Sequence, residues 1–97
     1  FMKKINDNTK LIREKNCFAA NLNSKKVILN TTNGKYVQLN KTAEFIWDFV
    51  TEERTYDELI AAILYKYEIQ DKKLIRKEVD EFLQACIKLK LIKLIAI

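Results

Sequence analysis

Few of the side chains that usually carry out chemistry in proteins occur in this chain. It has two cysteines, Cys17 and Cys86, and no histidine. Without histidine there is no Ser-His or Cys-His pair, and no side chain that normally titrates near neutral pH. Gly34 is the only glycine, so a glycine-rich phosphate-binding loop cannot form. Carboxylates and lysines are present, but no pair of them stands out, and we expect a protein that is not an enzyme.

The cysteine count also argues against a metal site or a disulfide. A structural zinc ion usually needs four Cys or His ligands. Cys17 and Cys86 lie far apart in the sequence, and a reducing cytoplasm would keep both as thiols. We therefore expect two small apolar core side chains, no bound metal and no cofactor.

The length of 97 residues suits one domain with one hydrophobic core. Phe1 precedes Met2, so we expect Met2 to be the natural start and Phe1 to have been added for expression. We expect an N-terminal tail over residues 1–9 and a single domain over residues 10–97. The apolar runs are far shorter than the roughly 20 residues that cross a bilayer, and no secretory signal is present. These features predict a cytoplasmic protein that does not act at a membrane.

The net charge of +5 is distributed unevenly along the chain. Residues 1–40 contain eight basic and two acidic side chains, residues 41–70 three and seven, and residues 71–97 seven and four. The central third is therefore acidic and both flanks are basic. This distribution suggests a positive face formed from the two ends of the chain.

The first forty residues have the pattern of β-strands. Residues 10–14 and 18–22 are short mixed segments, and residues 27–29 form an apolar run rich in β-branched side chains. Asn33-Gly34 is a strong signal for a two-residue hairpin turn. Such a turn would pair Ile28 with Leu39 and Asn30 with Val37, and would turn Ile28, Val37 and Leu39 inward and Tyr36 and Gln38 outward.

From Asn40 the apolar period becomes helical. Asn40 or Thr42 can cap a first helix by accepting hydrogen bonds from its free backbone amides. Thr55 and Glu58 have the spacing of a capping box for a second helix, and Asp71 can begin a third. The expected buried stripes are Ala43, Ile46, Trp47 and Val50, then Leu59, Ile60, Ile63 and Tyr67, then Ile75, Val79, Phe82, Cys86 and Leu89. For residues 91–95 a short strand and a frayed helix end both remain open.

Four motifs occur in a fixed order along the chain. A G-x-Y strand at residues 34–36 leads into LN-x-TA-x-x-IW at residues 39–47. The motif T-x-x-E-L follows at residues 55–59, and E-V-x-x-F-L at residues 78–83. In this order they resemble the PqqD family of recognition elements, which bind the leader segments of ribosomally made precursor peptides. The resemblance covers about residues 10–92.

The resemblance implies an α+β fold of the winged-helix-turn-helix kind, with a three-stranded antiparallel sheet followed by three helices. It also implies that a leader peptide adds as an extra strand beside the third strand and against the third helix. A polar stripe on that helix would hold acidic leader residues, and Leu83 or Ile87 would give apolar contact. The expected peptide-binding residues are Lys35, Tyr36, Val37, Gln38, Leu39, Lys73, Arg76, Lys77, Asp80 and Leu83.

The partners implied by the resemblance are the leader peptide and a modifying enzyme or leader peptidase of the same pathway. By family analogy, a free-standing domain of this length favours a lasso-peptide leader peptidase. An open strand edge can also pair with itself, so a homodimer remains open.

The main alternative is a winged-helix DNA-binding protein, which the pI of about 9.2 would suit. Against it, the hairpin precedes the helices, and the helix before the third one lies in the acidic segment, which repels phosphates. We therefore expect no nucleic-acid partner. A protein–protein adaptor without a peptide ligand is a second alternative.

Overall fold

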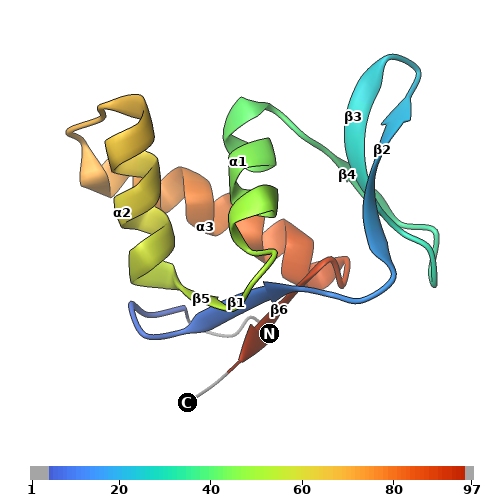
Figure 1. Cartoon of the computed structure of the whole chain (residues 1–97), viewed down its shortest axis with the longest axis horizontal. Coiled ribbons are helices and arrows are strands. Elements are labelled where there is room, and N and C mark those ends of the chain that lie inside the picture. Colours follow the sequence, from blue (N-terminus) through green and yellow to red (C-terminus); the bar gives the residue numbers. More distant parts are fainter. Residues whose placement is uncertain (1–4, 96–97) are drawn as a thin grey trace.

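The strands and helices are defined for residues 5–95 in a computed structural model of the chain (Figure 1). The expectations for Phe1 and Met2 concern residues outside this described part. The strands are β1 (Lys10–Arg13), β2 (Cys17–Leu22), β3 (Lys25–Asn30), β4 (Tyr36–Gln38), β5 (Arg54–Thr55) and β6 (Ile92–Ile95). The helices are α1 (Lys41–Phe49), α2 (Tyr56–Tyr67) and α3 (Lys72–Lys88).

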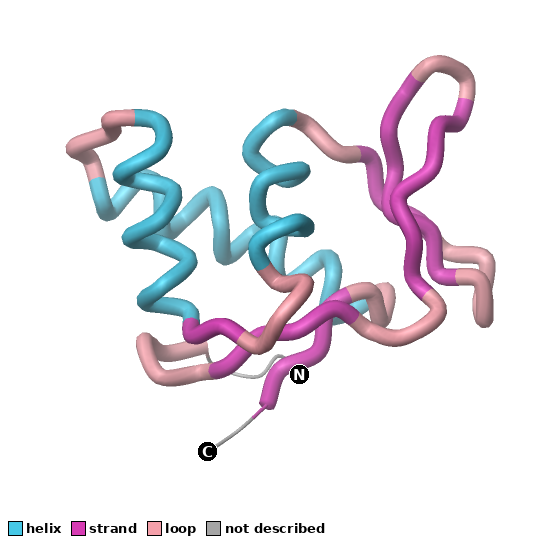
Figure 2. Tube along the Cα trace, viewed as in Figure 1, coloured by secondary structure: helices cyan, strands magenta, loops and turns pink. Residues whose placement is uncertain are grey.

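The strands form two small antiparallel sheets, one in the order β5-β1-β6 and the other in the order β2-β3-β4 (Figure 2). The α+β class with antiparallel strands and three helices is confirmed. The predicted three-stranded antiparallel sheet ahead of the helices corresponds to β2-β3-β4, but the second sheet was not predicted. β5 and β6 come from between and after the helices and pair with β1, and such pairing between distant segments leaves no local pattern in the sequence. The open question about residues 91–95 is decided for the described residues, because Ile92–Ile95 form a strand.

Residues 5–9, which we expected in a tail, contact the domain. Ile5 packs against the hydrophobic core, and Thr9 is buried. The Thr9 hydroxyl accepts a hydrogen bond from the Asn6 backbone N–H at 3.0 Å. The Thr9 carbonyl in turn accepts from the Tyr56 N–H at the start of α2, at 2.8 Å. This segment therefore belongs to the folded unit.

The β3–β4 hairpin closes through a longer loop than the two-residue turn we predicted. Ile28 lies opposite Val37 and Leu29 opposite Tyr36, so the predicted register is wrong by two residues. Asn30 explains the longer loop, because its buried side chain accepts a hydrogen bond from the Thr32 N–H at 2.9 Å. Its amide donates to the Lys90 carbonyl at 2.9 Å, which ties the loop to the end of α3. A shift of two residues keeps every side chain on its predicted face, because side chains alternate with a period of two.

The three helix starts follow the predicted caps. Asn40 caps α1 by accepting from the Ala43 N–H at 2.8 Å, and Asp71 caps α3 by accepting from the Leu74 N–H at 3.0 Å. Thr55 and Glu58 form the complete capping box of α2. These hydrogen bonds satisfy backbone amides that a helix itself leaves without partners.

The core lies among the three helices and is bordered by both sheets, since Leu11 of β1 and Ile92 of β6 belong to it as well as Ile28 of β3. All four predicted α1 residues are buried, as are Leu59, Ile60 and Ile63 of α2. Cys17 and Cys86 are both buried free thiols of this core, as predicted. Burial raises the pKa of the Cys86 thiol to about 12, so it is protonated at neutral pH.

Candidate functional site

The strand β4 lies at one edge of its sheet and pairs with β3 on one side only. The Leu39 N–H donates to the Lys26 carbonyl at 2.8 Å, and the Asn30 N–H donates to the Lys35 carbonyl at 2.9 Å. Because bonding alternates along an antiparallel pair, the backbone groups of Tyr36 and Gln38 point away from β3. Within residues 5–95, no strand pairs with this edge. The edge therefore offers the N–H and C=O groups of Tyr36 and Gln38 to another strand.

A cavity of about 450 Å³ lies beside this edge. Gln38 lines it from β4, Asn40 and Thr42 from the start of α1, and Glu78 and Phe82 from α3. An added strand would therefore have backbone partners on one side and a helix with side-chain contacts on the other, which is the arrangement that strand addition uses.

The α3 side of this cavity combines the apolar side chain of Phe82 with the negative charge of Glu78 and Glu81. Glu78, Phe82, Ala85 and Leu89 follow one another at helical spacing along one side of α3. Phe82 and Leu89 are partly buried against the core. Glu78 is exposed, and among the described residues neither it nor Glu81, which also lines the cavity, is in an ion pair. The cavity thus suits an apolar side chain next to a cationic one.

The polar stripe that we predicted on α3 faces a different part of the molecule. The Arg76 guanidinium lies 3.0 Å from the Asp7 carboxylate and 4.9 Å from the centre of the Tyr56 ring. The Tyr56 hydroxyl donates a hydrogen bond to the Asp80 carboxylate. Burial, followed by this hydrogen bond, raises the pKa of Tyr56, and the hydrogen bond to Asp7 raises the pKa of Arg76. Arg76 and Asp80 therefore hold α3 against α2 and residues 5–9.

The structure brings some of the predicted site residues together and separates others. Lys35, Tyr36 and Gln38 are exposed on or beside β4, Val37 is half-buried, and Leu39 is buried in the core. Lys73 and Lys77 are exposed on a shallow surface with Arg76 and Asp80, outside the cavity beside β4. The side chain of Leu83, another expected contact, is fully buried in the core.

Sequence reasoning missed Glu78, Glu81 and Phe82 as candidate site residues. We assigned Phe82 to the core because it fits the apolar period of α3, and it does pack there in part. The helical period predicts which side of α3 faces the core. It does not predict which of the remaining, polar sides of α3 lies next to β4. The motif E-V-x-x-F-L at residues 78–83 was the available signal, since it contains Glu78 and Phe82.

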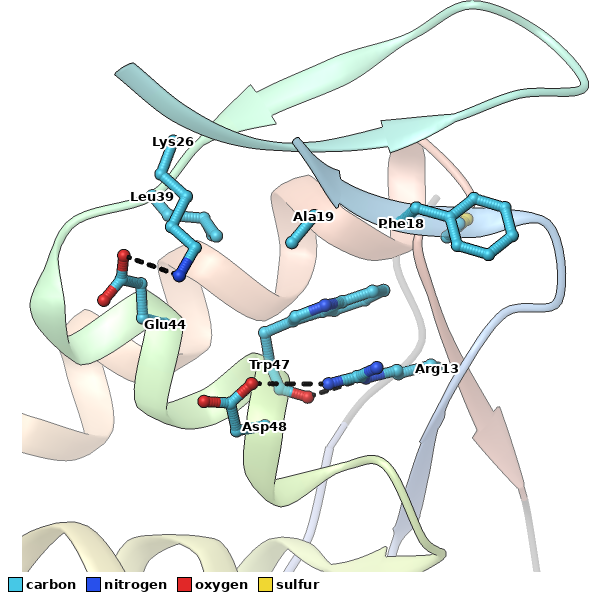
Figure 3. Close-up of a pocket in the computed structure, with 9 residues that line it drawn as sticks. Arg13, Phe18, Ala19, Lys26, Leu39, Glu44, Trp47 and Asp48 are labelled. Carbon is cyan, nitrogen blue, oxygen red and sulfur yellow. Dashed lines mark hydrogen bonds and ion pairs between the residues drawn. The ribbon is translucent and has the colours of Figure 1, made fainter. Parts of the chain in front are cut away.

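A second cavity, of about 280 Å³, lies beside the other edge strand, β2 (Figure 3). Its walls include Trp47 and two ion pairs, Arg13–Asp48 and Lys26–Glu44, each at 3.4 Å. The Arg13 guanidinium lies 4.3 Å from the centre of the Trp47 ring and donates to the Trp47 carbonyl at 2.9 Å. The charges of this cavity are therefore paired with one another.

Comparison with known proteins identifies the family. The family model described as Coenzyme PQQ synthesis protein D (PqqD) matches residues 25–92, which is more than half of the chain. The chain therefore belongs to the PqqD family, whose members are peptide-binding partners in the biosynthesis of ribosomally made, modified peptides. No curated protein and no solved structure matches closely enough to extend this comparison.

Residues 5–95 contain no helix of the length and hydropathy that crossing a bilayer requires. In the same part of the chain, no three His, Cys, Asp or Glu side chains are grouped so that they could hold a metal ion.

Proposed function

We propose that this protein binds the leader of a precursor peptide by strand addition at β4 and delivers it to a separate enzyme. The protein itself performs no chemistry in this proposal. It raises the effective concentration of the peptide at the enzyme's active site, which increases the rate without any new catalytic group. The protein acts in the cytoplasm, where precursor peptides are synthesised.

The observation that carries the proposal is the coincidence of the open β4 edge with the cavity lined by Gln38, Glu78 and Phe82. An open edge alone is common in sheets and is often blunted by charge. Here Tyr36–Gln38 carries no charge, and a helix lies across the cavity from it. Backbone hydrogen bonds would supply affinity, and the cavity would select the side chains of the bound segment.

The cavity predicts the chemistry of the leader. The apolar surface of Phe82 accepts a large apolar side chain, and Glu78 with Glu81 attracts a lysine or arginine nearby. The basic stripe on α3 had led us to expect acidic leader residues instead. Arg76 of that stripe is paired with Asp7, so we now expect basic residues near Glu78. The leader strand should therefore combine apolar and basic residues.

The arrangement of α1, α2 and α3 beside the β5-β1-β6 sheet is compatible with a winged-helix-like fold, which we propose as the fold type. The DNA-binding alternative is not supported. The matched family is one of peptide-biosynthesis partners.

The partner enzyme is a peptide-modifying enzyme or a leader peptidase of the same pathway. We favour a lasso-peptide leader peptidase, on family analogy alone.

The test is a titration of the isotope-labelled protein with the leader peptide encoded beside its gene, followed by NMR. The proposal predicts saturable binding, with the largest shifts in β4 and in Glu78 to Leu89 of α3. A random DNA duplex serves as the competing ligand, and salt-sensitive binding of the duplex without binding of the peptide would overturn the proposal.

A matched pair of proline variants isolates the strand edge. Gln38→Pro removes an N–H that points to the open edge and leaves the β3–β4 hydrogen bonds intact. Ala19→Pro does the same on the open edge of β2, because the pairing of Phe18 with Leu29 turns Ala19 outward. We expect Gln38→Pro to lower leader affinity by about tenfold, from loss of a hydrogen bond worth about 1–2 kcal/mol. Ala19→Pro should bind normally, and equal loss in both variants would argue against the β4 edge.

A further inference from the structure

The outward face of the β2-β3-β4 sheet is apolar. Antiparallel sheets with one face on the core usually present polar side chains on the other. Here the register places Phe18, Leu29 and Tyr36 in one row across the three strands. Ala20, Val27 and Gln38 form the next row, and Leu22 and Lys25 the last. We call Phe18, Ala20, Leu22, Val27, Leu29 and Tyr36 the outer face.

The helices do not cover this face. Figure 1 shows α1, α2 and α3 together on one side of the sheet. Phe18 is 59% exposed, Tyr36 53% and Leu22 44%, and these are three of the five exposed large apolar side chains among the described residues. Val27 is 4% exposed yet lies outside the main core cluster, so its neighbours on the outer face bury it. Exposed apolar side chains that gather in one patch usually mark an interaction surface.

The charges around the outer face restrict what can bind there. Residues 15–43 contain five lysines and no acidic side chain, although one of them, Lys26, lies on the other face and pairs with Glu44. Lys25 lies on the outer face itself, opposite Leu22. A second copy of the chain would bring lysines against lysines with no carboxylate between them. A partner with an apolar patch bordered by carboxylates would match both the apolar centre and the positive rim.

We propose that the outer face is the docking surface for the catalytic partner, through an apolar patch of that partner rimmed by Asp and Glu. This inference rests on the proposed function, which supplies the partner. A peptide strand added at β4 extends the sheet, and alternate side chains of that strand emerge beside Tyr36 and Gln38 on the outer face. An enzyme docked there contacts the domain and the bound peptide at the same time.

The test compares two double variants that carry the same change in charge. Phe18→Glu with Leu22→Glu alters the outer face on β2, away from the β4 edge, and Phe18 also borders the cavity beside β2. Tyr65→Glu with Leu74→Glu is the control, because Tyr65 and Leu74 are 88% and 50% exposed on α2 and α3. The probes are the leader peptide and the purified modifying enzyme or leader peptidase encoded beside the gene. Affinities are measured by isothermal titration calorimetry after circular dichroism has shown that each variant is folded.

The outer-face variant should lose at least about tenfold in affinity for the enzyme, as expected for removal of apolar anchors from an interface centre. It should keep its affinity for the leader, and the control should bind both as the wild type does. If the glutamates prevent folding, Phe18→Ser with Leu22→Ser replaces them.

Unchanged enzyme affinity in the outer-face variant, or a loss confined to the control, would overturn the docking proposal. A second result would also overturn it: the wild type forms a dimer, the outer-face variant is a monomer, and enzyme affinity is the same in both. The outer face would then be the contact between two copies of the chain. Failure of the wild type to bind the leader would refute the proposed function separately, while the enzyme titrations would still decide the docking surface.

Discussion

The two open edges of the β2-β3-β4 sheet differ in what lies beside them. The β2 edge borders a cavity in which Arg13 pairs with Asp48 and stacks on Trp47, so its charges are already compensated (Figure 3). The β4 edge borders a larger cavity in which Glu78 and Phe82 face the space beside the strand. The difference shows that an open strand edge becomes a candidate site only where the neighbouring helix has side chains still available for a ligand. On this basis we propose that the β2 side stabilises the fold and that the β4 side binds the peptide.

The largest expected effect lies on the β2 side. Trp47 is buried beneath Arg13, and Trp47→Ala should lower the free energy of unfolding by about 3–5 kcal/mol, through lost burial and the cavity left behind. Urea denaturation measures the change. Tyr65→Ala, at a highly exposed aromatic, should change the free energy by less than about 0.5 kcal/mol. A normal denaturation midpoint for Trp47→Ala would show that the β2 side does not have the structural role assigned to it.

The next effect should appear in binding on the β4 side. Phe82→Ala removes the apolar wall of the β4 cavity, and leader affinity should fall by about 5- to 30-fold, equivalent to about 1–2 kcal/mol. Phe45→Ala is the control, because Phe45 is also partly buried but stacks on Phe49 with ring centres 5.8 Å apart, away from both cavities. Equal affinities for the two folded variants would remove Phe82 from the site.

A smaller effect concerns the alkaline limit of stability. The pKa of the Cys86 thiol is raised by burial from 9.0 to about 12, so the unfolded chain loses this proton more readily than the folded one. The resulting stability is present below pH 9 and is lost as the pH rises toward 12, by at most about 1.4 kcal/mol per pH unit. Urea denaturation at pH 7.5, about 9 and about 10.5 should show this decrease, and Cys86→Ala should reduce its slope. Because the raised pKa of Tyr56 acts in the same direction, the variant should keep part of the slope. An unchanged slope would mean that Cys86 is not the titrating group.

The smallest effect is expected on the other side of α3. Arg76→Glu with Lys77→Glu reverses the charge of the predicted stripe, which faces Asp7 and lies outside the β4 cavity. Leader affinity should change by less than about twofold, and stability by no more than about 1 kcal/mol, because the Arg76–Asp7 pair is partly exposed. Calorimetric titration with the leader measures the first quantity. A large loss of affinity would restore the stripe as the binding surface and weaken the comparison between the two edges.

The sequence by itself determined the local features of this protein. Asn40, Thr55 with Glu58, and Asp71 begin the helices because their side chains reach backbone amides three residues away. The apolar period gave most of the buried side of each helix, with Leu83 of α3 as an exception, and the motifs at residues 34–47, 55–59 and 78–83 gave the family. All of these depend on neighbours in the chain, so a pattern in the sequence is enough to specify them.

The tertiary structure alone decided the features that depend on distant contacts. The pairing of β1 with β5 and β6 joins segments more than forty residues apart, and no turn between them fixes it. The hairpin register followed from the Asn30 side chain, which reaches Lys90. Which polar side of α3 faces β4 was likewise set by packing, because helical spacing defines sides of a helix but not their neighbours. Glu78 and Phe82 became candidate site residues only when the fold placed them beside Gln38.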